Sequence, residues 1–259
     1  MIRFDRPGPK RILVIGHRGA EALAPENTWA ALQQGCESGA DLLELDVQLT
    51  RNQEAIVFHD FTLQPKLGDP RWVREMTWQE LQTLDVGSWF DPAFATERIP
   101  RFADVLNWAR GRIALQVDLK HGFVEPRDDR LEMKALDLIE AAGMLDQVVI
   151  SSWDHVALMR IQARCPQVVL GVNLRPRVPD PLGAIAPVNA RWVSVPWSQV
   201  DRGTVKRLQD AGIKVSLCEL FTGGYRQARH LGVDAVTAPD PRAARQALEQ
   251  PVHETDSQP

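Results

Sequence analysis

Residues 39–49 read GADLLELDVQL, and this stretch decides the fold. Apolar side chains stand at every second position from 43 to 49, while Glu44, Asp46 and Gln48 lie between them. This period of two predicts a strand with one apolar face and one face that carries two carboxylates. If the apolar face packs on helices, the carboxylates point into the middle of a sheet or barrel, where ionised groups need a cation. The alternative is a half-exposed edge strand with solvated acids.

Short apolar runs alternate with helical patterns along most of the chain. The candidate strands are residues 11–15, 39–49, 113–119, 147–151, 168–172, 192–195, 214–217 and 235–238. Helical spacing recurs at residues 29–36, 102–110, 130–142, 154–164, 201–211, 224–231 and 241–248. Residues 54–58 are expected to pair with the second strand or to continue it. Eight strands that alternate with helices predict an α/β fold of the (β/α)8 TIM-barrel type, with a doubly wound sheet as the runner-up.

The length of 259 residues suits one large α/β domain, so we expect a single domain over residues 1–259. The regular alternation is interrupted between about residues 61 and 100, after the second strand, where one short helical piece is expected at residues 77–84. Six aromatic residues occur there among turn residues: Phe61, Trp72, Trp78, Trp89, Phe90 and Phe94. We expect a small inserted subdomain that is either a lid or binding loop, or a small core of its own.

Composition excludes several classes of protein. The chain is 44% apolar and 25% charged, as in soluble globular proteins, and no run approaches the roughly 18 apolar residues of a transmembrane helix. Its formal net charge is -4 and it has no extended basic cluster, which argues against nucleic acid as a partner. Its three widely spaced cysteines argue against a disulfide framework or a structural zinc site. The start has no apolar signal segment, so we expect a cytoplasmic protein.

Ionisable residues gather where the predicted strands end, which is where a barrel of this type places its chemistry. They are His17, Arg18, Glu44, Asp46, His59, Asp118 and Lys120. The three carboxylates lie on neighbouring strands, and such a set suits a hard divalent cation that prefers oxygen ligands, such as Mg2+ or Ca2+. A zinc site would normally use the histidines as ligands.

Two histidines and two basic side chains, Arg18 and Lys120, complete the candidate reaction centre. Imidazoles titrate near neutral pH, so His17 and His59 can act as general acid and general base. Arg18 offers a planar fork of donors to two phosphoryl oxygens, and Lys120 adds a point charge. These groups around one cavity favour an anionic substrate and suit phosphodiester cleavage, in which charge grows on the non-bridging oxygens.

Several motifs resemble one known family. The motif HRGA at residues 17–20, followed by PENT at 25–28, resembles the opening motifs of the glycerophosphodiester phosphodiesterases. Further similarities lie in ELD at 44–46, HD at 59–60, GSWF at 87–90 and GVDA at 232–235. The resemblance therefore covers nearly the whole chain.

The resemblance implies a fold, an activity and roles for residues. It implies a (β/α)8 barrel with a small insertion, which hydrolyses a small glycerophosphodiester to sn-glycerol 3-phosphate and an alcohol, in lipid and glycerol metabolism. By position in the motifs, His17 and His59 would be the acid–base pair, and Arg18 and Lys120 would meet the phosphate. The divalent metal, Mg2+ or Ca2+ with Mn2+ as a further option, would be held by Glu44, Asp46 and Asp118.

The chain departs from the family pattern at two places. The family usually has Glu-x-Lys on the third strand, whereas Asp118 is one methylene shorter and leaves the metal preference open. Near the seventh strand the family often has Trp-Thr-Val-Asn, but residues 216–219 read SLCE, which leaves the glycerol-side contacts open. We hypothesise that Glu219 reaches toward the cavity; the alternative is a solvated loop acid.

Two other functions remain compatible with the sequence. The same site can act on a lysophospholipid, as a lysophospholipase D-type hydrolase whose acyl chain contacts Trp72, Trp89, Phe90 and Phe94. A catalytically silent phosphate-binding barrel is the third interpretation, although both histidines are present. The sequence leaves open the head group, the identity of the acid and the base, the nucleophile and the oligomeric state.

Overall fold

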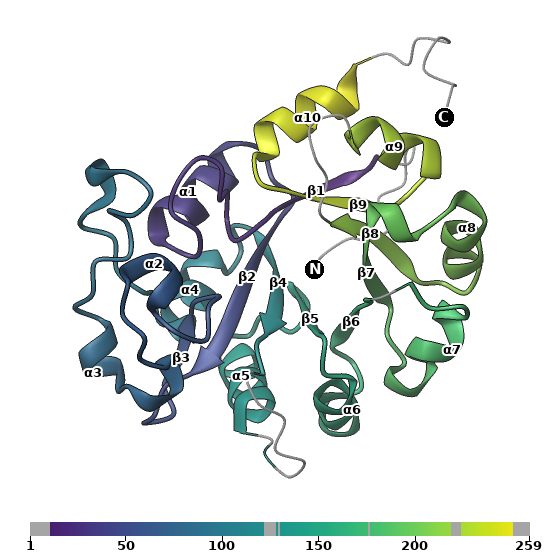
Figure 1. The fold of residues 1–259 in the computed structure, drawn as a ribbon. Coiled ribbons are helices and arrows are strands. Elements are labelled where there is room, and N and C mark those ends of the chain that lie inside the picture. Colours follow the sequence, from purple (N-terminus) through teal and green to yellow (C-terminus); the bar gives the residue numbers. More distant parts are fainter. Residues whose placement is uncertain (1–10, 122–127, 129, 176, 219–223, 251–259) are drawn as a thin grey trace.

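The core of the protein is a closed barrel of parallel strands. The computed structural model describes residues 11–121, 128, 130–175, 177–218 and 224–250. In these residues nine strands form one sheet in the order β1-β9-β8-β7-β6-β5-β4-β2-β3, and β1 also pairs with β2 (Figure 1). The strands are Leu13–Gly16 (β1), Leu42–Leu49 (β2), Ala55–Val57 (β3), Ala114–Leu119 (β4), Val148–Ser152 (β5), Val169–Asn173 (β6), Trp192–Pro196 (β7), Lys214–Cys218 (β8) and Ala235–Ala238 (β9). The predicted (β/α)8 barrel is confirmed, and residues 54–58 supply the antiparallel partner of β2.

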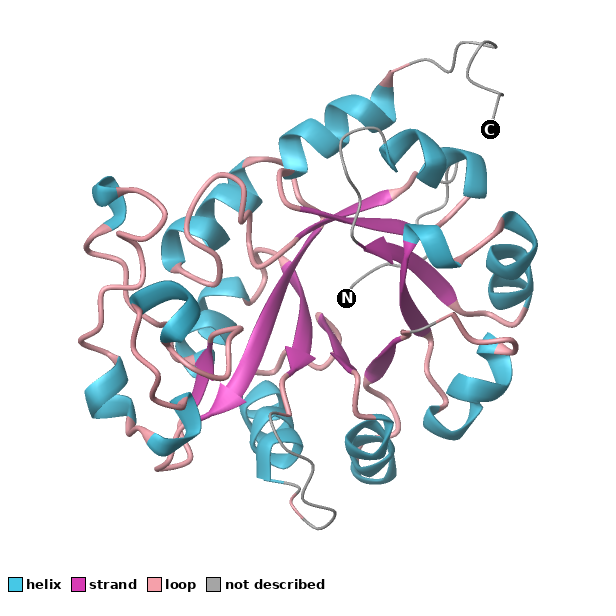
Figure 2. Ribbon diagram, in the orientation of Figure 1, coloured by secondary structure: helices cyan, strands magenta, loops and turns pink. Residues whose placement is uncertain are grey.

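Helices surround the barrel on its outside (Figure 2). The α-helices are Trp29–Glu37 (α1), Gln64–Leu67 (α2), Trp78–Leu81 (α3), Phe102–Ala109 (α4), Arg130–Ala141 (α5), His155–Arg164 (α6), Pro181–Ile185 (α7), Arg202–Asp210 (α8), Gly224–Leu231 (α9) and Pro241–Glu249 (α10). In the described part of the chain, 3-10 turns occur at Val73–Glu75 (η1), Pro92–Phe94 (η2), Ala186–Val188 (η3) and Trp197–Gln199 (η4). The sequence pattern missed α2 and α7, because each is only about one turn long and begins around a proline. Within the described residues, every helix is too short or too polar to cross a lipid bilayer.

Strand β2 has the two faces that its sequence predicts. Leu43, Leu45 and Val47 are fully buried in the main hydrophobic cluster between the sheet and the helices. Glu44 and Asp46 have the opposite parity and point into the barrel. An edge strand is excluded, because β2 pairs with β1, β3 and β4. Burial of the apolar face therefore fixes the register, and with it the direction of both carboxylates.

The interior of the barrel is filled on one level by a separate apolar cluster. It consists of Ile15, Leu42, Val149, Trp192 and Ala235. Leu42 has the same parity in β2 as Glu44 and Asp46, so this cluster packs inside the barrel next to the carboxylates, nearer the amino ends of the strands. The polar groups therefore gather at the carboxyl ends, over an apolar floor.

The insertion of residues 61–100, between β3 and α4, packs around a small hydrophobic cluster that is separate from the main core. Its buried members are Ile56 and Phe58, which precede the insertion, and Leu63, Val73, Met76, Leu81, Val86 and Ile99 within it. Most of them are aliphatic, whereas Phe61 is 36% exposed and Trp89 is 40% exposed. The segment also starts and ends at one place on the barrel, because Val57 N donates to Pro100 O over 2.9 Å and Ile56 forms an antiparallel bridge with Arg101. The segment therefore has a small core, but aliphatic side chains form most of it, and the role of the segment as a lid or binding loop stays a prediction.

A buried carboxylate connects β4, α5 and α6. The side chain of Glu132 is 0% exposed, and it accepts hydrogen bonds from His121 Nε2 at 3.1 Å and from Arg160 Nη1 at 2.7 Å. Burial raises the pKa of the Glu132 carboxyl, but these two hydrogen bonds outweigh it, so the pKa lies below its ordinary value. Because His121 directly follows Lys120, the Glu132 cluster holds the segment that leaves the carboxyl end of β4.

Candidate active site

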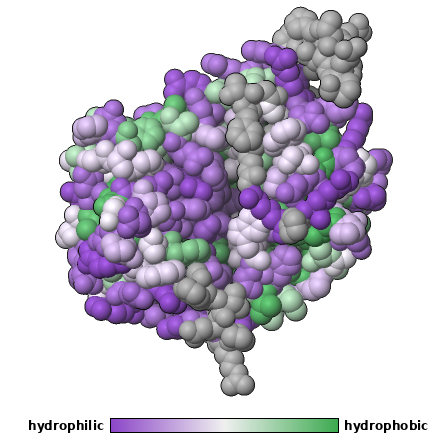
Figure 3. All heavy atoms as spheres, viewed as in Figure 1, coloured by the Kyte–Doolittle hydropathy of each residue, from purple (hydrophilic) through white to green (hydrophobic). Residues whose placement is uncertain are grey.

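Three carboxylates lie together at the carboxyl end of the barrel. In the register of β2 and β4, Asp46 pairs with Asp118 and Glu44 pairs with Gln116. One oxygen from each of Glu44, Asp46 and Asp118 lies within 4.8 Å of the others, and all three residues are buried. They line a cavity of about 510 Å3, and Figure 3 shows hydrophilic residues gathered around a hollow over the middle of the barrel.

The three carboxylates are buried and close together, so ionising all of them without a cation would cost much free energy. Burial, and then the charge of Asp46, raises the pKa of Glu44 to about 7, and burial raises the pKa of Asp118 to about 7. Burial also acts to raise the pKa of Asp46, but the charges of Lys120, His59 and Arg18 outweigh it and hold that pKa below its ordinary value. Without a further cation, the site therefore retains protons near neutral pH.

The donor set fits a hard divalent ion. Three carboxylates offer oxygen ligands, and Mg2+ and Ca2+ prefer such ligands with water in the remaining positions. The buried side-chain oxygen of Gln116 lines the same cavity and has no hydrogen-bond partner among the described residues. A buried oxygen that accepts no hydrogen bond costs free energy of folding, which a bound cation or its water would offset. Glu44, Asp46 and Asp118 can therefore hold a metal ion.

Two cationic side chains flank the carboxylates. Lys120 Nζ lies 3.5 Å from an oxygen of Asp46 and 3.5 Å from an oxygen of Asp118. Arg18 donates from its backbone N to Glu44 Oε2 at 2.9 Å, and its Nε lies 3.5 Å from Asp46 Oδ2. Arg18 has a left-handed backbone with φ 48°, which costs about 1–3 kcal/mol and turns the chain sharply after β1. The turn is stabilised by a hydrogen bond from Asn27 N to Arg18 O at 3.0 Å.

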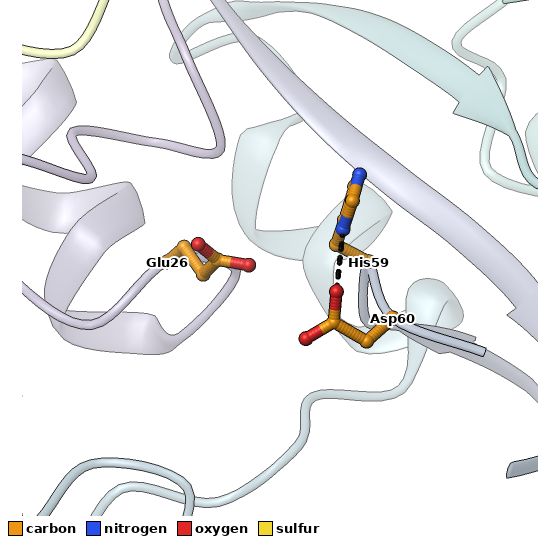
Figure 4. A group of neighbouring side chains, drawn as sticks. All are labelled: Glu26, His59 and Asp60. Carbon is orange, nitrogen blue, oxygen red and sulfur yellow. Dashed lines mark hydrogen bonds and ion pairs between the residues drawn. The ribbon is translucent and has the colours of Figure 1, made fainter. Parts of the chain in front are cut away.

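Each of the two histidines at the cavity is held by a carboxylate. His17 Nδ1 lies 2.6 Å from Glu21 Oε1, and His59 Nδ1 lies 2.9 Å from Asp60 Oδ1 (Figure 4). A carboxylate at Nδ1 keeps the proton of the neutral ring on that nitrogen, so Nε2 remains able to accept a proton. Burial lowers the pKa of His17, but the hydrogen bond to Glu21 and the charges of Glu44 and Glu21 outweigh it and raise this pKa above its ordinary value. His17 Nε2 lies 3.9 Å from Glu44 Oε2, so it faces the carboxylates.

Two asparagines fix the orientation of the carboxylates. Asn27 Nδ2 donates to Asp46 Oδ2 at 2.8 Å, and Asn27 Oδ1 accepts from Asp46 N at 3.2 Å. Asn173 Nδ2, at the end of β6, donates to Asp118 Oδ1 at 2.8 Å. Neither role was predicted from the sequence: Asn27 was named only as part of the PENT motif, in which Thr28 is the N-cap of α1. One feature of the sequence could have identified Asn173 as a candidate site residue: it directly follows the candidate strand at residues 168–172.

A second group of acids and a histidine lies beside the first. Glu26, His59 and Asp60 each offer a ligand atom within 4.8 Å of the others, and Figure 4 shows the Glu26 carboxylate facing Asp60 and His59. Arg18 Nη1 donates to Glu26 Oε1 at 2.9 Å, and Lys66 Nζ lies 3.2 Å from Glu26 Oε2. Side-chain cations therefore already balance this group.

The structure brings all seven residues singled out in the sequence to one cavity. The same cavity is lined by Trp153, Arg175 and Cys218, which the sequence analysis did not assign to the site, and Trp153 is 46% exposed. Cys218 stands at the departure from the family pattern near the end of β8. Glu219, for which we hypothesised a contact with the cavity, lies outside the described residues.

Comparison with known proteins identifies relatives by sequence. A family model described as the glycerophosphoryl diester phosphodiesterase family matches residues 17–238. A glycerophosphodiester phosphodiesterase of Caldanaerobacter subterraneus is 34% identical over 163 residues, which cover 62% of this chain and 66% of the relative. One from Bacillus subtilis is 36% identical over 150 residues, which cover 58% of this chain and 48% of the relative. The matched part thus spans less than two thirds of the length of these curated relatives.

Solved structures match nearly the whole chain. A glycerophosphodiester phosphodiesterase from Agrobacterium tumefaciens has a TM-score of 0.78 and 28% identity, covering 90% of this chain and 99% of that one. An Oleispira antarctica phosphodiesterase in complex with the product sn-glycerol-3-phosphate has a TM-score of 0.85 and 24% identity, covering 92% of this chain and 97% of that one. The second likeness shows the shared fold. Together with the match over residues 17–238, these findings place the chain in the glycerophosphoryl diester phosphodiesterase family.

Proposed function

We propose that this protein hydrolyses glycerophosphodiesters to sn-glycerol 3-phosphate and an alcohol, with the help of a divalent metal ion. One observation carries the proposal: two imidazoles, each held at Nδ1 by a carboxylate, lie at the same cavity as three buried carboxylates whose oxygens lie within 4.8 Å of one another. Family membership supports the reaction class. The names of the relatives, and the product bound to the Oleispira antarctica phosphodiesterase, support the choice of substrate.

The metal would be held by Glu44, Asp46 and Asp118, and we favour Mg2+ or Ca2+, with Mn2+ as a further option. When bound, such an ion neutralises charge that develops on the phosphoryl oxygens. Asp118 is shorter than the glutamate usual in the family, but its register with Asp46 and its hydrogen bond from Asn173 aim it at the other two carboxylates. Arg18 and Lys120, which line the same cavity, would contact the phosphoryl group.

The histidines would move the protons of the reaction. One Nε2 accepts a proton from the nucleophile, whose oxygen forms a new bond to phosphorus. The other imidazolium donates a proton to the alcohol oxygen as the bond from phosphorus to that oxygen breaks. The nucleophile is water or the 2-hydroxyl of the substrate, and the second route passes through a cyclic phosphate that water then opens. Unchanged turnover of a substrate that lacks the 2-hydroxyl would exclude the second route.

A chelation experiment tests the proposal. The enzyme is stripped with a chelator, and turnover of glycerophosphocholine, glycerophosphoethanolamine and glycerophosphoglycerol is measured after Mg2+, Mn2+ or Ca2+ is restored. We expect turnover to vanish on chelation and to return with at least one ion, with sn-glycerol 3-phosphate as the product. Undiminished turnover after chelation, or a failure of all three substrates with all three ions, would overturn it.

A lysophospholipid is the second candidate substrate, and one observation favours it. A neighbouring cavity of about 390 Å3 shares Lys120 with the first, and Phe61 and Trp72 of the insertion belong to its lining, among charged side chains such as Arg74. Of the four aromatic residues expected to contact an acyl chain, Trp72 belongs to the described lining of this cavity, and Trp89, Phe90 and Phe94 do not. The two aromatic side chains beside Lys120 offer an apolar contact for an acyl chain. Competition between a lysolipid and glycerophosphocholine distinguishes the two: lysolipid hydrolysis with the higher kcat/KM would favour this second candidate. A silent phosphate-binding barrel has less support, because both histidines keep their carboxylate partners at the cavity.

Metal binding should strengthen as the pH rises toward neutral. Glu44 and Asp118 have pKa values of about 7 in the folded protein, and a cation must displace the protons that they hold at lower pH. Both pKa values lie above the ordinary ones of 4.5 and 3.8, so these protons stabilise the metal-free fold at low pH, and that contribution is lost as the pH rises through about 7.

Thermal unfolding measures this linkage. We expect Mg2+ to raise Tm more at about pH 8 than at about pH 5.5, because affinity falls by up to roughly tenfold per displaced proton per pH unit. The Asp118→Asn variant should show a smaller dependence on pH. An equal shift of Tm at both pH values would contradict the prediction.

Replacing Asn173 should weaken the metal site. In the Asn173→Leu variant Asp118 loses the hydrogen bond at Oδ1 that orients it, and loss of such a contact typically costs roughly 10- to 100-fold in metal affinity. The concentration of Mg2+ that gives half-maximal activity measures the effect. The matched control is Asn107→Leu on the exposed side of α4, which should leave that concentration unchanged. Equal metal requirements in both variants would contradict the orienting role.

A further inference from the structure

Lys66 of the insertion contacts Glu26, which in turn binds Arg18 at the cavity. Lys66, in α2 of the insertion, lies with its Nζ 3.2 Å from Glu26 Oε2, while Glu26 Oε1 accepts a hydrogen bond from Arg18 Nη1 at 2.9 Å. The carboxylate of Glu26 therefore joins two cations, one from the insertion and one from the turn after β1. We call this set the Lys66–Glu26–Arg18 bridge.

The bridge is shielded from solvent and has a defined geometry. The side chains of Glu26, Lys66 and Arg18 are 11%, 17% and 18% exposed, so water screens their charges only partly. Lys66 Nζ also lies 4.0 Å from the centroid of the Trp89 ring, in a cation–π contact that adds to its contact with Glu26. Trp89 comes from a different part of the insertion, so two of its segments together fix the position of Lys66.

Arg18 needs this support because acids surround it. Its guanidinium lies near Asp46 Oδ2 at 3.5 Å and near Glu21 Oε2 at 3.8 Å, in addition to Glu26. A guanidinium binds a phosphoryl group well only when its fork is aimed and its charge is available. Lys66 acts on both requirements: it fixes the direction of Glu26 and shares the charge of that carboxylate, which would otherwise fall on Arg18 alone.

We propose that Glu26 and Lys66 are positioning residues for phosphate binding by Arg18, so that the insertion sets the affinity of the site for phosphoryl groups. The proposal rests on the proposed function in one respect, the contact between Arg18 and the phosphoryl group. It gives the insertion a role in the reaction beyond its own small core. It also explains why a partly buried glutamate lies so close to the arginine that is proposed to bind the phosphoryl group.

A double-mutant cycle tests the bridge. The variants are Lys66→Met, Glu26→Gln and the pair together, with Lys66→Arg as the rescue and Lys206→Met as the matched control, since Lys206 forms an exposed ion pair with Asp210. Calorimetry on the metal-loaded enzyme measures the Kd of inorganic phosphate, and kinetics with a glycerophosphodiester measure KM and kcat. Thermal unfolding of each variant reports on its stability.

The bridge predicts a specific pattern. In Lys66→Met, the Kd of phosphate and the KM rise together by roughly 3- to 30-fold, while kcat is unchanged. Lys66→Arg restores both values, and Lys66→Met adds no further loss in the Glu26→Gln background. A merely structural lysine would instead lower Tm and leave Kd and KM as they are.

Three outcomes would overturn the proposal: an unchanged Kd in Lys66→Met, an equal loss with and without Glu26, or no phosphate binding by the unmodified enzyme. Failure of the proposed function gives a different result. The unmodified enzyme would then bind phosphate in a manner that depends on Lys66, yet it would hydrolyse no glycerophosphodiester.

Discussion

Replacing either His17 or His59 with glutamine lowers kcat for a glycerophosphodiester by roughly 10^2- to 10^4-fold, the usual contribution of a proton-transfer group. Glutamine keeps much of the size and polarity of the ring but cannot exchange a proton near neutral pH. Both rings are held at Nδ1 by a carboxylate, which leaves Nε2 for the reaction. Steady-state kinetics in the presence of the metal measure the loss, and KM should change far less than kcat.

An activated leaving group separates the two roles. Nitrophenolate leaves without a proton, so the nitrophenyl ester of glycerophosphate should restore turnover in the variant that lacks the acid, but not in the one that lacks the base. The control is His230→Gln, on α9 and outside the lining of the cavity, which should retain full activity. Full activity in His17→Gln or His59→Gln would remove that residue from the mechanism.

The Glu132→Leu variant is expected to lose about 3–5 kcal/mol of stability. Glu132 is fully buried, and its removal leaves His121 and Arg160 without the carboxylate that binds both. Its pKa lies below the ordinary value, so this contribution is present above about pH 4.5 and is lost as the pH falls through the lower pKa of the folded state. Chemical denaturation at about pH 7 measures the loss.

A pair on the same two helices provides the control for Glu132. Glu140 of α5 binds Arg164 of α6 at 2.7 Å, but these side chains are 35% and 39% exposed. Glu140→Gln should therefore cost only about 0–1 kcal/mol, since water solvates the charges that remain. Equal losses in the two variants would show that burial does not set the strength of the Glu132 cluster.

The sequence predicts the barrel well, because its signals are local and repeat. In β2 the period of two placed Leu43 and Leu45 against the helices and Glu44 and Asp46 in the interior, as the structure has them. Alternation with helices then sets the architecture, since parallel strands joined by helices leave few other ways to bury both faces of the sheet. The short helices α2 and α7 escaped prediction, because each contains a proline and is too short to show a helical period, whereas α3 falls within the short helical piece expected at residues 77–84.

The candidate site was predictable only in part. The seven residues at strand ends were expected to lie together because a barrel brings those ends together, and the structure places all seven at one cavity. Contacts that depend on the path of loops were not found, since nothing local in the sequence links Lys66 to Glu26 or Asn173 to Asp118. Such contacts form between segments that meet only after the insertion and the barrel have packed.

The hydrogen bond from Val57 N to Pro100 O brings the two ends of the insertion together, as is needed for a segment that is to be exchanged as one unit. Its two ends are adjacent on the barrel, and His59 precedes its first residue. A graft of residues 61–100 from another family member would leave His59 in place while replacing Lys66, Phe61 and Trp72. We therefore expect that exchange of this one segment changes the range of substrates and leaves unaltered the strands that carry Glu44, Asp46 and Asp118.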